Sequence, residues 1–258
     1  MSDAWVRAAL AFPIGLVLGS FMTVVVARVP AKQSLVRPRS RCPACGTSIQ
    51  NRDNVPVVSW LLLRGRCRSC EARISVRYPL LELSTGVLVA AAAAVAPDVW
   101  TAILLGALVS MLPAIAVIDL EHRIIPNRMM YPSLLVFPAL VLLAWALGGE
   151  VDPIRALLGA LAYGGGLLVV AAVSGGMGFG DVKLATVIGI ALGGLGLRYV
   201  AVAAAAGILA GGVAAAGALA LGRGRKSAIP FGPAIALGAI VSVLVGEQIA
   251  AAYLRTLG

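Results

Sequence analysis

Two aspartates lie at the ends of long apolar runs. Placing a carboxylate there costs free energy, so its presence suggests a function. Asp119 ends the run AIAVID, and Asp181 follows the glycine-rich run GGMGFG. A charged side chain at the centre of a bilayer costs about 2.5–3.5 kcal/mol, so an acid in such a run is a functional candidate. Two carboxyl groups can hydrolyse a peptide when one takes a proton from water and the other hydrogen-bonds the carbonyl. We therefore predict that Asp119 and Asp181 form an aspartyl pair.

Four glycines precede the second aspartate within six residues: Gly175, Gly176, Gly178 and Gly180. Glycine allows a backbone to adopt unusual conformations and to approach another segment closely. We expect Gly178 and Gly180 to form an active-site loop with room for a substrate backbone. The alternative is that Asp181 is a solvated loop acid at the end of a helix.

Three other ionisable residues lie beside the aspartates. Glu121 is expected to be a solvated loop acid, and His122 an interfacial residue rather than a catalytic base. Lys183 has two interpretations: it holds the Asp181 carboxylate, or it extends to the membrane surface.

All four cysteines lie in one polar segment, as two CxxC pairs with 21 residues between them: Cys42, Cys45, Cys67 and Cys70. Two such pairs predict a tetrahedral zinc site. The site is expected to be structural, because four thiolates leave no open position for water or substrate. Two disulfides are the alternative, which a cytoplasmic location disfavours because thiols stay reduced there.

The composition predicts that a bundle of transmembrane helices positions these residues. The chain has 258 residues, of which 60% are hydrophobic and 12% charged, whereas soluble domains carry about 25% charged residues. We therefore expect an all-α polytopic membrane protein, with the lipid bilayer as a partner. Runs near the ~20 residues that span a bilayer predict eight transmembrane helices, at residues 8–27, 79–96, 100–118, 130–147, 154–174, 183–197, 199–221 and 232–254.

A basic insert at residues 28–78 interrupts the apolar pattern, with eleven Lys and Arg residues against two acids. Basic loops mark the cytoplasmic side, so the insert is expected to face the cytoplasm, near anionic lipid headgroups. The same charge asymmetry places Asp119 and Asp181 on that side. The net charge of +10 then reports membrane orientation, and no nucleic-acid partner is expected.

Several segments resemble the prepilin peptidases, which are membrane aspartic proteases of the GxGD type. IDLEHRIIPN and GMGFGDVKL are similar to the two motifs that carry the family's catalytic aspartates. The resemblance continues through GSFMTVVVARVP, the cysteine-bearing segment from RCPACG to ELSTG, and IPFGPAIALG. Thr23 stands where the family usually has asparagine. Together, in the family's order, these motifs cover almost the whole chain.

The resemblance implies that Asp119 and Asp181 are catalytic. It implies removal of the basic leader of type IV prepilins or pseudopilins at the cytoplasmic face of the bacterial inner membrane. The zinc module of this family is associated with N-methylation of the new amino terminus by S-adenosylmethionine. Gly65, in LRGRC, matches a position linked to methylation, and its alternative interpretation is a turn glycine. The expected domains are a first span (1–27), a zinc module (28–78) and a membrane peptidase domain (79–258).

Three other functions fit parts of the pattern. A peptidase without methylation fits the aspartates, and no glycine-rich nucleotide-binding motif is visible. An ion-coupled transporter fits the intramembrane acids, although such acids usually lie near the midplane of the membrane. A membrane-tethered zinc-ribbon adaptor fits the cysteines but leaves GFGD unexplained.

Overall fold

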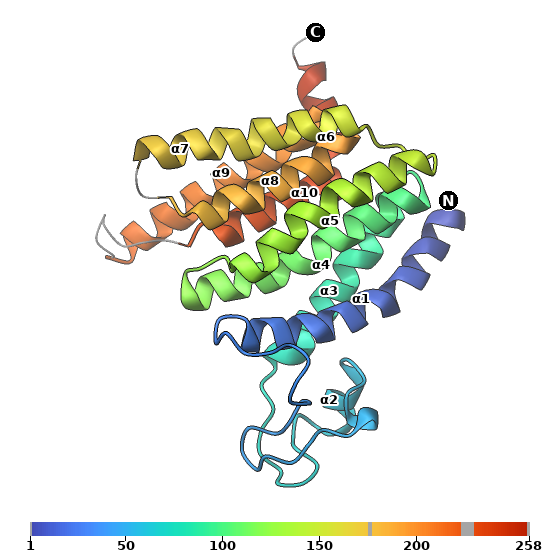
Figure 1. Cartoon of the computed structure of the whole chain (residues 1–258), viewed down its shortest axis with the longest axis vertical. Coiled ribbons are helices and arrows are strands. Elements are labelled where there is room, and N and C mark those ends of the chain that lie inside the picture. Colours follow the sequence, from blue (N-terminus) through green and yellow to red (C-terminus); the bar gives the residue numbers. More distant parts are fainter. Residues whose placement is uncertain (1, 175–176, 223–229, 257–258) are drawn as a thin grey trace.

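The computed structural model describes residues 2–174, 177–222 and 230–256 (Figure 1). Within these ranges the chain forms helices and no strand longer than an isolated bridge, which confirms the predicted all-α membrane fold. The elements are α1 (Ser2–Arg28), the 3-10 turn η1 (Asn51–Asp53), α2 (Val58–Leu62), α3 (Arg77–Val95), α4 (Val99–His122), α5 (Asn127–Ala146), α6 (Pro153–Ala160), the π-helical turn η2 (Leu161–Gly165), α7 (Gly166–Ser174), α8 (Phe179–Leu195), α9 (Leu197–Ala220) and α10 (Gly232–Arg255).

Seven helical spans in the described part of the chain are long and apolar enough to cross a membrane, with α6, η2 and α7 together forming one of them. The remaining predicted span, at residues 183–197, corresponds to α8, which has only 17 residues. At about 1.5 Å per residue, α8 is shorter than a hydrocarbon core of about 30 Å. Figure 1 shows α8 in the middle of the bundle, between α7 and α5. The predicted count of eight therefore includes one short inner helix.

Small residues let the helices pack closely. A Cβ added at Gly159 of α6 would lie 2.3 Å from the carbonyl oxygen of Gly189 in α8. One added at Gly238 of α10 would lie 2.3 Å from the carbonyl oxygen of Ala203 in α9. Without a hydrophobic driving force between helices in lipid, such close packing is a main source of association. These contacts fix α8 and α10 beside their neighbours.

The two helices that carry the aspartates are enclosed by protein. In the apolar stretch of α4, 72% of the residues are buried. This is the largest share among the candidate spans in the described ranges. Most residues of α8 are also buried. Their fully buried side chains form the centre of the core: Leu104, Leu105, Leu108, Leu112, Ile115, Leu184, Ile188 and Leu192. Because these side chains pack closely together, they hold the ends of α4 and α8 in a fixed relation.

Polar contacts tie the cysteine-bearing insert to the end of α4 and the start of α5. Arg77, where α3 begins, forms an ion pair with Glu121 near the end of α4. Arg128 of α5 donates to the carbonyl of Gln33, just after α1, at 2.8 Å. The end of α4 that bears Asp119 is therefore on the same side of the bundle as the insert.

Some residues used in the sequence interpretation lie outside the described ranges. These are Gly175 and Gly176 before α8, and the basic residues Arg223, Arg225 and Lys226 between α9 and α10.

Candidate functional site

Asp119 and Asp181 line one pocket of about 270 Å³. Asp119 lies one turn before the end of α4, and Asp181 lies in the first turn of α8. Asp119 is only 5% exposed, and Asp181 is partly buried. The other lining residues are Arg123, Ile124, Ile125, Asn127, Gly178, Phe179, Gly180 and Lys183. A pair of carboxyl groups in one small pocket can share a proton and hold a water molecule.

The first turn of α10 holds Asp119 in place. The backbone N–H of Gly232 donates to Oδ2 of Asp119 at 2.8 Å. A Cβ at Gly232 would lie 2.7 Å from that same oxygen, so only glycine lets the backbone come this close. With Oδ2 fixed by the N–H, the other oxygen of Asp119 is left for a ligand in the pocket. Gly232 belongs to the segment IPFGPAIALG, but nothing local in that segment indicates this contact.

The connection between α4 and α5 forms one wall of the pocket. Arg123 ends α4 in the left-handed conformation, with φ of 55°, and its N–H donates to the carbonyl of Asp119 at 2.8 Å. Gly180 packs against this wall, and a Cβ there would lie 2.8 Å from Cβ of Ile125. The glycine therefore lets the start of α8 lie against the α4–α5 connection.

Gly178 differs from Gly180, although both belong to the glycine-rich motif. Gly178 has φ of −72° and ψ of 141°, an extended conformation open to any residue. A Cβ there would approach no other residue's side chain except Oδ2 of Asp181, at 3.3 Å. Neither backbone strain nor packing within the described chain explains the glycine. What it leaves is open space beside the Asp181 carboxylate.

Lys183 binds α5 rather than Asp181. Its ammonium donates to Oδ1 of Asn127 at 2.6 Å and to the hydroxyl of Tyr131 at 3.2 Å. It also lies 4.4 Å from the centre of the Tyr131 ring, within the range of a cation–π contact. Lys183 thus joins α8 to α5 at the pocket. Asn127 is the last residue of the motif IDLEHRIIPN, which does not by itself indicate the contact with Lys183.

The four cysteines converge on one point. Their sulfur atoms all lie within 4.8 Å of one another, and the sulfurs of Cys42 and Cys70 are 3.8 Å apart. A tetrahedral zinc with Zn–S distances of about 2.3 Å requires sulfurs about 3.8 Å apart. All four are free thiols, so the donor set and its spacing fit a zinc ion.

The two CxxC pairs lie in equivalent turns. The N–H of Cys42 donates to the carbonyl of Thr47, and that of Cys67 to the carbonyl of Ala72, both at 2.9 Å. The residue after each pair adopts a positive φ, 72° at Gly46 and 57° at Glu71. This repeated geometry brings the sulfur atoms of both pairs to a common centre.

The rest of the insert is held by a few specific contacts. Asp53 accepts two hydrogen bonds from the Arg68 guanidinium, which holds the pKa of the Asp53 carboxyl below its usual range. Gly65 has φ of 66°, and a Cβ there would lie 2.9 Å from the Trp60 ring. The turn interpretation of Gly65 therefore has a structural basis, and its link to methylation stays a prediction.

Comparison with known proteins gives two family matches. Residues 14–96 match the Bacterial Peptidase A24 N-terminal domain, and residues 106–216 match the Type IV leader peptidase family. The first match includes the cysteine cluster, and the second includes both aspartates. No solved structure gives a significant match.

Three curated relatives carry the same name, prepilin leader peptidase/N-methyltransferase. The one from Bacillus subtilis (strain 168) is 37% identical over 95% of this chain and 96% of its own length. The one from Aeromonas salmonicida (strain A449) is 33% identical over 98% of this chain and 96% of its length. The one from Myxococcus xanthus (strain DK1622) is 51% identical, over 58% of this chain and 43% of its length.

Proposed function

Because the chain belongs to the prepilin leader peptidase/N-methyltransferase family, we propose that it removes the leader of type IV prepilins or pseudopilins and N-methylates the new amino terminus. The chain is a multi-pass membrane protein, and we propose that its catalytic groups are Asp119 and Asp181. The observation that carries this assignment is the shared pocket, to which two distant parts of the chain each bring one carboxylate. An ion-coupled transporter is not favoured.

The proposed cleavage uses both carboxyl groups and one water. One carboxylate takes a proton from the water as it attacks the scissile carbonyl, while the other, protonated, donates a hydrogen bond to the carbonyl oxygen. The leaving amine then receives a proton from the pair. The Gly232 N–H keeps Asp119 oriented, and the open space at Gly178 accommodates the substrate backbone beside Asp181.

We propose that Cys42, Cys45, Cys67 and Cys70 hold a structural Zn²⁺. Four thiolates complete its tetrahedron, so the ion would take no part in the chemistry. S-adenosylmethionine, when bound, supplies a methyl group that leaves its sulfonium and joins the new amine, which gives up one proton. We propose that the module and both aspartates face the cytoplasm, because the insert is strongly basic.

Cleavage of a leader-bearing pilin segment by the purified protein tests the function. Asp119→Asn and Asp181→Asn should each abolish cleavage, because asparagine keeps the shape but cannot transfer the proton. Asp152→Asn is a matched control, since Asp152 caps α6 outside the pocket. Near-normal turnover in either pocket variant would exclude that aspartate from catalysis. Mass spectrometry of the product reports leader removal and methylation separately.

A further inference from the structure

Glu82 is a buried acid that the proposed cleavage does not use. It lies in the second turn of α3 and is 9% exposed, and Asp119 is the only other buried acid among the described residues. Gly19 of α1 packs against its backbone, since a Cβ there would lie 2.7 Å from the Cα of Glu82. No described cation forms an ion pair with Glu82. Burying a carboxylate costs free energy unless a partner satisfies it, so the partner of Glu82 indicates its role.

That partner is a backbone N–H of the insert. Oε2 of Glu82 accepts from the N–H of Val57, at 2.7 Å. Val57 directly precedes α2, the short helix between the two CxxC pairs. Among the described residues, this is the one hydrogen bond or ion pair that joins residues 39–74 to a helix of the bundle. Apart from the chain connections, it is what ties the cysteine-bearing part of the insert to the bundle.

Val57 adopts a strained conformation at this tie. Its φ is 61° and its ψ is −51°, and the N–H of Val58 donates across it to the carbonyl of Pro56, at 2.6 Å. This is the rare, strained form of the γ-turn. Val57 is the only β-branched residue with a positive φ in the described ranges, and such a side chain disfavours that conformation. Strain of this kind persists only where the surroundings hold it, and Glu82 holds the N–H of Val57.

Further contacts connect Val57 to the second CxxC pair. The carbonyl of Val57 accepts from the N–H of Leu61, at 3.1 Å, and so begins α2. The indole N–H of Trp60 in α2 donates to the carbonyl of Ile74, at 3.1 Å. The N–H of Ile74 donates in turn to the carbonyl of Gly65, at 2.7 Å. Because Gly65 and Ile74 flank the second CxxC pair, a shift of Val57 also moves that pair.

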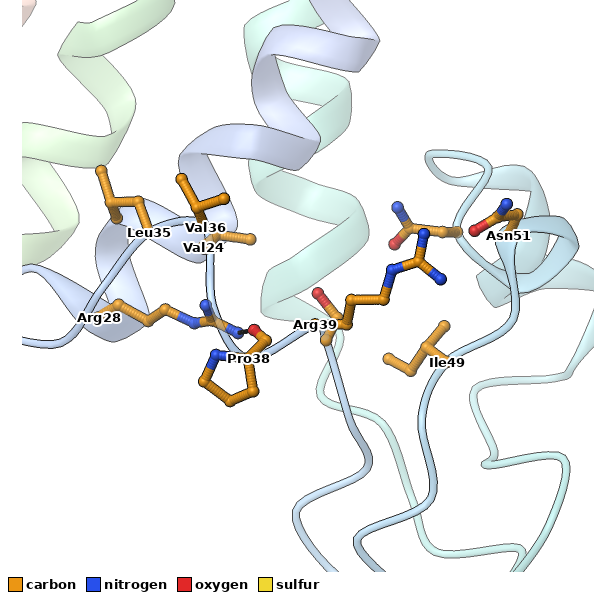
Figure 2. Close-up of a pocket in the computed structure, with 10 residues that line it drawn as sticks. Val24, Arg28, Leu35, Val36, Pro38, Arg39, Ile49 and Asn51 are labelled. Carbon is orange, nitrogen blue, oxygen red and sulfur yellow. Dashed lines mark hydrogen bonds between the residues drawn. The ribbon is translucent and has the colours of Figure 1, made fainter.

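Packing alone does not fix the insert on the bundle. A groove of about 220 Å³ lies between the end of α1 and the insert. Figure 2 shows this groove, with Arg28 of α1 at one end and Asn51 of η1 at the other. Arg28 holds only the first part of the insert, by donating to the carbonyls of Ser34 and Pro38 at 2.9 and 2.8 Å. The part that bears the cysteines therefore depends on the bond to Glu82.

We propose that Glu82 is a positioning residue for N-methylation, whose carboxylate holds the cysteine-bearing part of the insert where the amine released at the aspartates reaches it. This inference rests on the proposed N-methylation and on its expected association with the insert. Glu82 acts as a hydrogen-bond acceptor for Val57, and its charge has no described partner. Cleavage does not need it, because Glu82 lies outside the aspartate pocket.

Substitutions that separate reach from charge test this role. Glu82→Gln keeps a side-chain oxygen at the same distance from the backbone, so methylation should stay within about twofold of wild type. Glu82→Asp keeps the charge but is one carbon shorter, and Glu82→Leu keeps most of the volume but has no acceptor. Each of these two should methylate the cleaved pilin segment at least about tenfold less. Glu150→Leu is the matched control, because the Glu150 side chain has no partner among the described residues.

The readouts are mass spectrometry of the pilin product, zinc content and amide hydrogen exchange, all with the full-length protein. Exchange at residues 55–62 should become faster in Glu82→Asp and Glu82→Leu, because the bond to α3 is lost. Leader cleavage and zinc content should match wild type. Normal methylation by Glu82→Asp with loss in Glu82→Gln would show that the charge matters, and would reject the positioning role. Equal loss of cleavage and methylation would show general damage to the fold, and would reject it too.

The wild-type protein separates failure of this inference from failure of the proposed function. If wild type methylates and Glu82→Leu methylates equally well, the inference alone is wrong. If wild type removes the leader but does not methylate the product, the proposed methylation fails, and the role of Glu82 in it fails as well.

Discussion

Gly232 donates its backbone N–H to the buried carboxylate of Asp119 across 113 residues of sequence. This one bond links the first turn of α10 to the end of α4. It also requires glycine, because the Cβ of any other residue at position 232 would lie only 2.7 Å from the carboxylate oxygen. The geometry of the aspartate pocket therefore depends on a residue that bears no functional group.

Gly232→Ala should reduce leader cleavage at least tenfold while the protein stays folded. The added methyl group would lie 2.7 Å from Oδ2 of Asp119, so the carboxylate must rotate and lose its hydrogen bond. Gly212→Ala in α9 is the control, because a Cβ there meets nothing within 4 Å. Cleavage rate and thermal unfolding should be measured for both. Normal cleavage by Gly232→Ala would show that this bond does not set the active geometry.

The two glycines of the GFGD motif should respond differently to alanine. Gly180→Ala puts a methyl group 2.8 Å from Cβ of Ile125, and such overpacking costs about 1–3 kcal/mol. Gly178→Ala meets only the Asp181 carboxylate, at 3.3 Å, and should change stability by about 0.5 kcal/mol or less. It should instead raise the KM for the pilin segment, because it fills space left for the substrate.

Thermal unfolding and steady-state kinetics distinguish these two effects. A stable Gly178→Ala protein with unchanged KM and kcat would contradict a role for the open space in substrate binding. An undisturbed Gly180→Ala protein would contradict the packing argument.

The fold was largely predictable because bilayer thickness and hydropathy leave few choices for an apolar chain. The helix bounds follow the apolar runs closely, and the short run predicted at residues 183–197 corresponds to α8, which with 17 residues is too short to span the core. The motifs indicated the aspartates and cysteines. Gly232 and Asn127 lie within the segments IPFGPAIALG and IDLEHRIIPN, but those segments do not indicate their contacts with Asp119 and Lys183, because each contact joins residues far apart in the sequence. Gly178 and Gly180 likewise look equivalent until their neighbours are known.

Zinc should copurify at about one ion per chain. Cys45→Ser should release it, because serine is a poor replacement for a thiolate ligand. The basic insert has few large buried side chains of its own, so loss of metal should also make residues 29–76 more sensitive to protease. Ser69→Ala, inside the second CxxC pair, should keep the metal. Elemental analysis and limited proteolysis give the result, and two disulfides without metal would reject the site.

Both aspartates should lie on the cytoplasmic side of the membrane. The Arg77–Glu121 ion pair places Glu121 beside the insert, whereas the N–H of Glu150 bonds Asp98 at the opposite end of α4, at 2.9 Å. With 24 residues, α4 is about 36 Å long, enough to put these two acids on opposite faces of the bilayer. A third useful position, Ser227, lies outside the described residues.

Cysteines introduced at these two acids make the orientation measurable. A membrane-impermeant maleimide added to intact spheroplasts should label Glu150→Cys at once. It should label Glu121→Cys only after the membrane is permeabilised. The opposite pattern would put both carboxylates on the outer face. A basic leader held in the cytoplasm could not reach them there, and the peptidase assignment would fail despite the match of both motifs.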